Sequence, residues 1–184
     1  NRPADARAIL QRASERGLEF AGARRLSYLI AFVQGDASVM ARELDASVGV
    51  GGTNAAFGWQ AHASAFGGRA KAAHEQFGLG IQMSLQGRFQ EVAAQLMTED
   101  AENHAVVGQC GQARDEVTRA LELSQDNVTL ERASRALGWC GHSAESSRLS
   151  AVLARRFPEA TLTRYAAVPI ADAAQAQDFA GWLT

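Results

Sequence analysis

Two neighbouring stretches, Leu137-Gly-Trp-Cys-Gly-His-Ser-Ala144 and Leu153-Ala-Arg-Arg-Phe-Pro158, decide the fold. They predict a helix, a tight turn at Gly141, a second helix and a stop at Pro158, because glycine favours helix-ending turns and proline cannot continue a helix. One helical hairpin cannot bury its apolar face alone, so the hairpin should recur along the chain. The pattern of a glycine between two helical segments does recur, about every 33 to 40 residues, at Gly35, Gly68, Gly108 and Gly141.

Apolar residues at helical spacing predict nine to eleven helices. No sheet is expected, because no stretch of four or more residues alternates apolar and polar residues with β-branched enrichment. Helices are expected at 4–16, 54–66, 89–107, 128–140 and 144–156, with others beginning at 21, after Asp36, after Gly68 and after Gly111. Asp36 and Asp126 are the expected N-caps. Inward-facing positions include Leu26, Leu29, Ile30 and Val33 on the second helix, and Ala73, Phe77, Ile81 and Leu85 on the fifth.

The bulk composition is that of a folded, soluble segment. Of the 184 residues, 47% are hydrophobic and 21% are charged, which excludes a disordered chain. A net charge of −2 gives no reason to expect nucleic acid or an anionic membrane as partner, and no apolar run is long enough to span a bilayer. The chain begins at Asn1 without a signal-peptide pattern, so we expect an excised or processed piece of a larger protein.

The sequence predicts no metal, no cofactor and no disulfide. Packed helices lie about 8–10 Å apart, whereas a disulfide needs Cα atoms within about 7 Å, so Cys110 and Cys140 are expected to be free thiols. His104, His142 and the cysteines lack the short paired spacings of a zinc site. The compartment is left open, with the cytoplasm slightly favoured.

No catalytic motif is present, so we expect the protein not to be an enzyme. The glycine-rich stretch 49–52 lies between two helices and lacks the lysine of a phosphate loop, which indicates a connector. Ser143 and Ser146 follow His142 without a nucleophile elbow, and we interpret them as cap and surface residues.

Small and bulky residues recur at matching places on the second helix of successive hairpins: Ala73, Phe77 and Gly80, then Ala113, Val117 and Ala120. With Pro158 at the end of the last second helix, this pattern resembles the tetratricopeptide (TPR) repeat. The resemblance covers about residues 4–158 and implies an all-α, right-handed α-α superhelix, a TPR-like solenoid of about four hairpins. Residues 1–184 would form one repeat domain, with 159–184 as C-terminal capping helices kinked at Pro169.

A narrower resemblance points to a parent protein. Phe32-Val-Gln-Gly-Asp-Ala-Ser-Val-Met40, Ala65-Phe-Gly-Gly-Arg-Ala-Lys-Ala72 and the 153–158 stretch resemble TPR segments attached to bacterial eukaryotic-like serine/threonine kinases or to winged-helix regulators. No kinase motif is present, so no kinase activity is implied.

The resemblance implies a non-catalytic scaffold whose first helices line a concave groove for a protein or peptide ligand. By repeat register, the groove residues would be Arg25, Leu29, His62, Gln95, Thr98, Glu102, Glu131 and Arg135. The acidic run around Glu99 and Glu102 is either a solvated face or a selector of basic ligands. The carboxylate clamp of some TPR proteins is missing. Trp59 and Trp139 are interpreted as core. The alternatives are a spacer or self-association module, which could form a homodimer, and an enzyme using His62 and Glu102.

Overall fold

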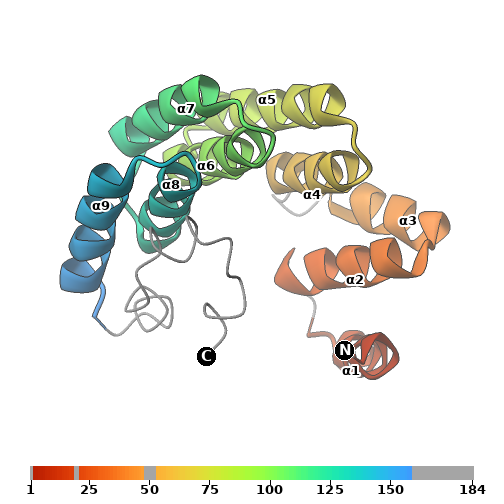
Figure 1. The fold of residues 1–184 in the computed structure, drawn as a ribbon. Helices are drawn as coiled ribbons and strands as arrows, with labels where there is room; N and C mark the ends of the chain where they lie inside the picture. The colour runs from red at the N-terminus through yellow and green to blue at the C-terminus, as the bar shows by residue number, and fades with distance from the viewer. Residues whose placement is uncertain (1, 19–20, 48–52, 159–184) are drawn as a thin grey trace. The chain divides into compact units, whose positions relative to one another are not determined.

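A computed structural model describes the chain except for residues 1, 19–20, 48–52 and 159–184. This described part contains nine α-helices and no strand (Figure 1). The predicted fold class, an all-α chain of helical hairpins, is therefore confirmed. The helices are α1 (Pro3–Glu15), α2 (Ala21–Gln34), α3 (Ala37–Ser47), α4 (Thr53–Phe66), α5 (Ala70–Gln86), α6 (Gln90–Val106), α7 (Cys110–Leu123), α8 (Asn127–Trp139) and α9 (Ser143–Arg156).

The chain divides into two compact units, residues 1–80 and residues 81–184. The first unit contains α1 to α4 and most of α5, and the second contains the end of α5 and α6 to α9. The predicted connector at 49–52 and the predicted capping segment 159–184 with Pro169 lie outside the described residues. Within the described residues, no helix is both long and apolar enough to cross a membrane.

Glycine ends the first helix of each hairpin. Gly35, Gly68, Gly108 and Gly141 all have φ between +69° and +78°, in the left-handed region that favours glycine. At Gly141 the next amide, that of His142, donates to the Leu137 carbonyl at 2.9 Å. This bond gives a carbonyl in the last turn of the helix a hydrogen-bond donor, as in a Schellman motif. The predicted turn positions are confirmed.

The turn between α5 and α6 differs, because Arg88 rather than a glycine takes the left-handed conformation, at φ +62°. The Phe89 amide still donates to the Ser84 carbonyl at 2.8 Å, so the hydrogen-bond pattern is the same. Gly87 lies one residue before the position that needs the left-handed conformation. The backbone at Arg88 is consequently strained.

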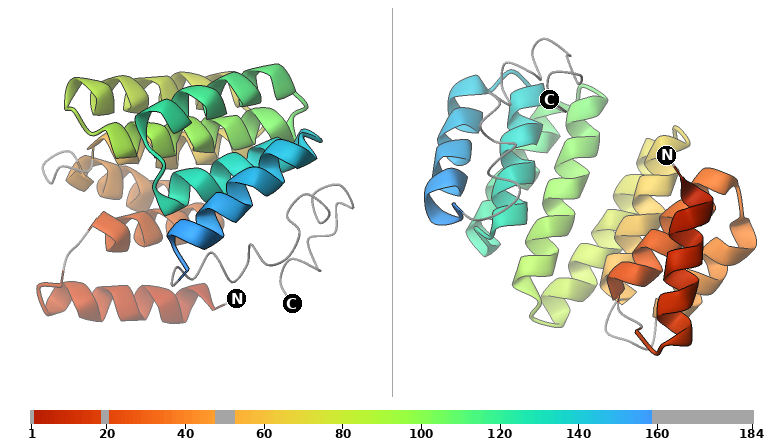
Figure 2. Two further views of the ribbon diagram at one scale, coloured as in Figure 1. Left: turned by 90° about the vertical axis from the view of Figure 1, so that its left-hand side faces the viewer. Right: turned by 90° about the horizontal axis from the view of Figure 1, so that it is seen from below.

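The second unit is built from two antiparallel hairpins, α6–α7 and α8–α9, with α6 packed beside α8 (Figure 2). Its core is made of small residues at the close approaches and larger aliphatic residues between them: Ala101, Ala105, Ala113, Val117, Leu130, Ala133, Ala136, Leu137, Leu149 and Leu153. Ala113, Val117 and Ala120 are buried, as the repeat pattern predicts. Small residues let helices approach closely, which explains their place in this core.

The first unit has a smaller core around Tyr28, Ala56 and Trp59, with the rings of Tyr28 and Trp59 5.9 Å apart. The inward face predicted for α2 is wrong in part, because Leu26 and Val33 are exposed whereas Tyr28 and Ala31 are buried. The helix is rotated so that its aromatic residue, which offers more area to bury, faces α4.

The structure also differs from the predicted packing on α5, α1 and α9. On α5, Ala73, Phe77 and Ile81 are buried as expected, but Leu85, close to the helix end, is exposed. On α1, the predicted apolar stripe is present in the sequence, yet the helix contains no buried residue. On α9, Ser146 is fully buried and not on the surface.

The prediction of free thiols is wrong: a disulfide joins Cys110 and Cys140, whose Cα atoms are 5.5 Å apart. The helix-packing distance does not apply to them, because Cys110 begins α7 and Cys140 is the C-cap of α8. Both cysteines lie at the ends of helices, beside the turns at Gly108 and Gly141, where two chain segments approach more closely than two helix axes can.

Candidate functional site

A charged face runs along α6 and α8 in the second unit. Gln95, Glu99 and Glu102 lie on α6 at i, i+4 and i+7, a spacing that places them on one side of the helix. Glu131, Arg132 and Arg135 lie on α8, which packs beside α6. We call these six residues the α6–α8 charged face. Of the predicted groove residues, the structure therefore brings together Gln95, Glu102, Glu131 and Arg135.

Ion pairs connect the two helices across this face. Arg135 is paired with Glu102 on α6 and with Glu131, one turn earlier on its own helix. Arg132 Nη1 lies 2.5 Å from Glu99 Oε1 and 3.4 Å from the backbone oxygen of Gln95, to which it donates. The charged side chains are mostly buried, and each keeps a small exposed part at the surface.

Among its six residues, the face holds three carboxylates, those of Glu99, Glu102 and Glu131, and two guanidiniums, those of Arg132 and Arg135. Burial raises the pKa of Glu102 to about 7, although Arg135 and Arg132 oppose that shift. Burial raises the pKa of Glu131 as well, against the same two arginines. At both Glu102 and Glu131, burial thus outweighs the opposing effect of the two guanidiniums.

Asp126 closes one end of the face. Its Oδ1 accepts from the backbone amides of Val128 and Thr129, which makes it the N-cap of α8, as predicted. The same oxygen accepts from Gln95 Nε2 at 3.2 Å, so the cap is also bonded to α6. Burial acts to raise the pKa of Asp126, but its hydrogen bonds with Thr129, Ser124 and Gln95 outweigh burial and lower it.

Trp139 lies near the Arg135 end of the face. Its ring centroid is 5.7 Å from the Arg135 guanidinium carbon, within the range of a cation–π contact. The indole is partly buried against the second-unit core, whereas Trp59 is fully part of the first-unit core. The prediction that both are core residues is confirmed for Trp59, and Trp139 belongs partly to the core and partly to the charged face.

The remaining predicted groove residues do not join this face. Thr98 has no exposed surface, and its hydroxyl donates to the Gln95 carbonyl at 2.9 Å. The charged side of α6 passes through 95, 99 and 102, which leaves Thr98 on the core side. Arg25, Leu29 and His62 belong to the first unit, where Arg25 is exposed and Leu29 packs against the Tyr28–Trp59 core. His62 makes an edge-on ring contact with Phe77 at 5.3 Å.

Arg132 is absent from the predicted groove set although it is central to the face. The signal was available, because residues three apart on a helix share a side and Arg132 precedes Arg135 by three positions. The disulfide removes the thiols of Cys110 and Cys140 as metal ligands.

Comparisons with known proteins do not assign this chain to a family. No protein-family model matches it, and no curated protein or solved structure is similar enough to count as a match.

Proposed function

We propose that this protein is a non-catalytic, TPR-like scaffold and that its α6–α8 charged face binds a basic segment of a partner protein or peptide. The observation that supports the proposal most directly is the excess of one carboxylate over the guanidiniums on that face, together with the raised pKa of Glu102. A lysine or arginine side chain from a ligand would supply the missing positive charge.

The geometry supports a peptide rather than a reaction. Glu99, Glu102 and Glu131 are each paired with an arginine, an arrangement that fixes the positions of their carboxylates for the recognition of a cation. A cation brought to a partly buried carboxylate gains more from the lower local dielectric than it would at a fully exposed one. Trp139, beside Arg135, adds an aromatic surface on which the stem of a lysine or arginine could pack.

The test uses the full chain and two labelled peptides, one of alternating lysine and alanine and one of alternating glutamate and alanine. The proposal expects the lysine peptide to bind and the glutamate peptide not to bind. Glu102→Gln and Glu131→Gln should each weaken binding about tenfold, the scale of one charged hydrogen bond. Glu122→Gln, an exposed glutamate on α7, is the matched control and should leave binding unchanged.

Affinity should also depend on pH in a specific direction. Because the pKa of Glu102 is about 7 in the free protein, more of its carboxylate is ionised at pH 8 than at pH 6. Binding of the lysine peptide should strengthen over that interval in the wild type and much less in Glu102→Gln. Equal binding of both peptides, or no effect of either glutamate variant, would overturn the assignment of this face.

Self-association is the second candidate function. Two apolar side chains of the first unit support it: Phe66 is 84% exposed and Val33 is 75% exposed, while neighbouring Phe32 is in edge-on contact with the Phe66 ring at 5.4 Å. Sedimentation velocity over a hundredfold range of protein concentration tests this candidate. A mass that rises with concentration and falls back in Val33→Ser with Phe66→Ser would favour a self-association module over a peptide-binding scaffold.

A further inference from the structure

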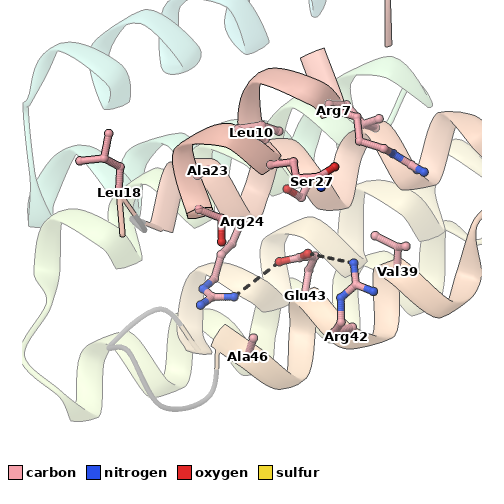
Figure 3. A pocket seen from close by; sticks show the side chains of 13 residues that line it. Arg7, Leu10, Leu18, Ala23, Arg24, Ser27, Val39, Arg42, Glu43 and Ala46 are labelled. Carbon is pink, nitrogen blue, oxygen red and sulfur yellow. Dashed lines mark ion pairs between the residues drawn. The ribbon is translucent and has the colours of Figure 1, made fainter. Parts of the chain in front are cut away.

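The first unit contains a cleft that the proposed function does not use. It lies among α1, α2 and α3 and has a volume of about 480 Å³ (Figure 3). Clefts of roughly 300–1,000 Å³ are the usual size for small organic ligands. The cleft belongs to a different unit from the α6–α8 charged face. A ligand assigned to the cleft can therefore be tested independently of the proposed function.

One part of the cleft wall is aliphatic. Leu10 comes from α1, Leu18 from the residues that follow it, Ile30 from α2 and Val39 from α3. No residue of α1 is buried, although Leu10 belongs to an amphipathic stripe on that helix. A helix of this length takes most of its stability from burying such a stripe. An apolar occupant of the cleft would bury part of it.

The polar part of the cleft is rich in arginine. Arg24 and Arg42 lie on either side of Glu43, with nitrogen to carboxylate oxygen distances of 3.6 Å and 3.7 Å (Figure 3). The Glu43 carboxylate is therefore shared between the two guanidiniums. Arg7, from α1, also lines the cleft, and its Nη2 lies 3.7 Å from Asp36 Oδ2 at the start of α3.

Guanidiniums outnumber carboxylates among the residues that line the cleft. The lining contains the three guanidiniums of Arg7, Arg24 and Arg42 and the carboxylate of Glu43, and the carboxylate of Asp36 lies beside Arg7. Arg42 is the most accessible of the three, because its side chain is 68% exposed whereas that of Arg24 is 23% exposed. An incoming anion can therefore reach Arg42 without first displacing a buried ion pair.

We propose that this cleft binds a small amphipathic carboxylate, a molecule with an aliphatic tail and one carboxylate group. The carboxylate pairs with Arg42 beside Glu43, and the tail lies against Leu10 and the other aliphatic side chains of the cleft. Guanidinium and carboxylate groups match in a two-hydrogen-bond geometry, and the tail supplies the apolar burial that α1 lacks. A free small molecule fits the cleft volume better than a peptide, which would require a continuous groove.

Isothermal titration calorimetry of the full chain with three twelve-carbon probes tests which head-group charge the cleft prefers. Dodecanoate carries a carboxylate, dodecanol is neutral and dodecyltrimethylammonium is cationic, and each is used below the concentration at which it aggregates. Dodecanoate should bind with a stoichiometry of one and the ammonium probe should not bind. Equal binding of all three would reduce the cleft to a nonspecific apolar surface and overturn the proposal.

Paired substitutions test whether dodecanoate binds in this cleft. Arg42→Gln should weaken dodecanoate binding about tenfold, whereas Arg25→Gln, an exposed arginine of the same unit that does not line the cleft, should have no effect. Glu43→Gln removes the competing carboxylate and should strengthen binding several-fold, a change that a purely structural disturbance would not produce. An unchanged affinity in Arg42→Gln, or a weaker one in Glu43→Gln with an unaltered thermal midpoint, contradicts the proposal. So does an acidic peptide that binds in an Arg42-dependent way while dodecanoate does not.

Discussion

Ser134 and Ser146 exchange hydrogen bonds between α8 and α9. The Ser134 hydroxyl donates to the Ser146 carbonyl at 2.9 Å, and the Ser146 hydroxyl donates to the Ser134 carbonyl at 2.8 Å. Neither residue has any exposed surface. The two helices can approach this closely because serine is small, and each buried hydroxyl finds a hydrogen-bond partner on the other helix. Ser150, 2.7 Å from the Ser134 hydroxyl, extends the contact by one turn of α9.

Enlarging Ser146 should therefore separate the last two helices. Ser146→Leu should lower the free energy of unfolding by about 1–3 kcal/mol or more, because it overfills the contact and removes a hydrogen bond to a buried carbonyl. Ser147→Leu places the same side chain on the exposed side of α9 and should change stability by less than about 0.5 kcal/mol. Urea unfolding followed by circular dichroism compares the two; equal effects would mean that the α8–α9 contact is loose.

Removing the disulfide should destabilise the second unit. Cys110→Ser with Cys140→Ser frees a closed loop with a sequence separation of 30 residues, for which chain entropy predicts a loss of about 3–4 kcal/mol. A thiol reductant should lower the urea midpoint of the wild type to that of the double variant and leave the variant itself unchanged. If reductant has no effect on the wild type, the two sulfur atoms are not bonded in solution.

Relieving the strain at Arg88 should stabilise the turn between α5 and α6. A residue with a Cβ at φ +62° is disfavoured by about 1–2 kcal/mol, and part of the gain from glycine is offset by the extra entropy of the unfolded chain. Arg88→Gly should raise the free energy of unfolding by about 0.5–1 kcal/mol. Gln86→Gly, which places glycine inside the last turn of α5, should lower it instead, and thermal melts of both variants provide the comparison.

Glu102 should make stability fall as pH rises from about 4.5 to 7. Its pKa is about 7 in the folded protein against 4.5 in the unfolded chain, so the folded state binds more protons over this interval. The stabilisation is complete below pH 4.5 and is lost as pH rises through 7. Glu102→Gln should flatten the slope only in part, because the pKa of Glu131 is raised too. Urea midpoints at pH 5, 6, 7 and 8 measure the slope, which Glu122→Gln should leave unchanged.

Leu137 tests the packing of the second-unit core. Its side chain is 3% exposed on the face of α8 that packs against the other helices, so Leu137→Ala should lower the free energy of unfolding by about 2–5 kcal/mol. Arg148→Ala, at an exposed position of α9, serves as the control. A loss of less than about 1 kcal/mol at Leu137, measured in urea, would mean that this part of the core rearranges to fill the space.

The turns and helix boundaries could be predicted from the sequence because they depend on local chemistry. Gly141 adopts a positive φ that other residues avoid, and Asp126 accepts hydrogen bonds from amides two and three residues away. Both effects act within a few residues and need no knowledge of the rest of the chain. The predicted bounds of most helices consequently agree with the structure within one or two residues.

The predictions are wrong where the structure depends on residues that are distant in the sequence. The rotation of α2 toward Tyr28 depends on the aromatic neighbour that α4 supplies, and periodicity alone could not choose between Tyr28 and Leu26. The Cys110–Cys140 bond depends on how close two turns come, which a rule for helix axes does not describe. The repeat register selected residues of α6 and α8 that the structure brings together, but it could not determine that Thr98 faces inward.

The disulfide also changes what a protease would release. The only described connection between α7 and α8 is the short segment at residues 124–126, in which Gln125 is exposed, and this segment lies inside the covalent ring that the bridge closes. A single cut there would leave both fragments attached through Cys110 and Cys140. On a denaturing gel without reductant the nicked chain would migrate as one species, and the cut would become visible only after reduction.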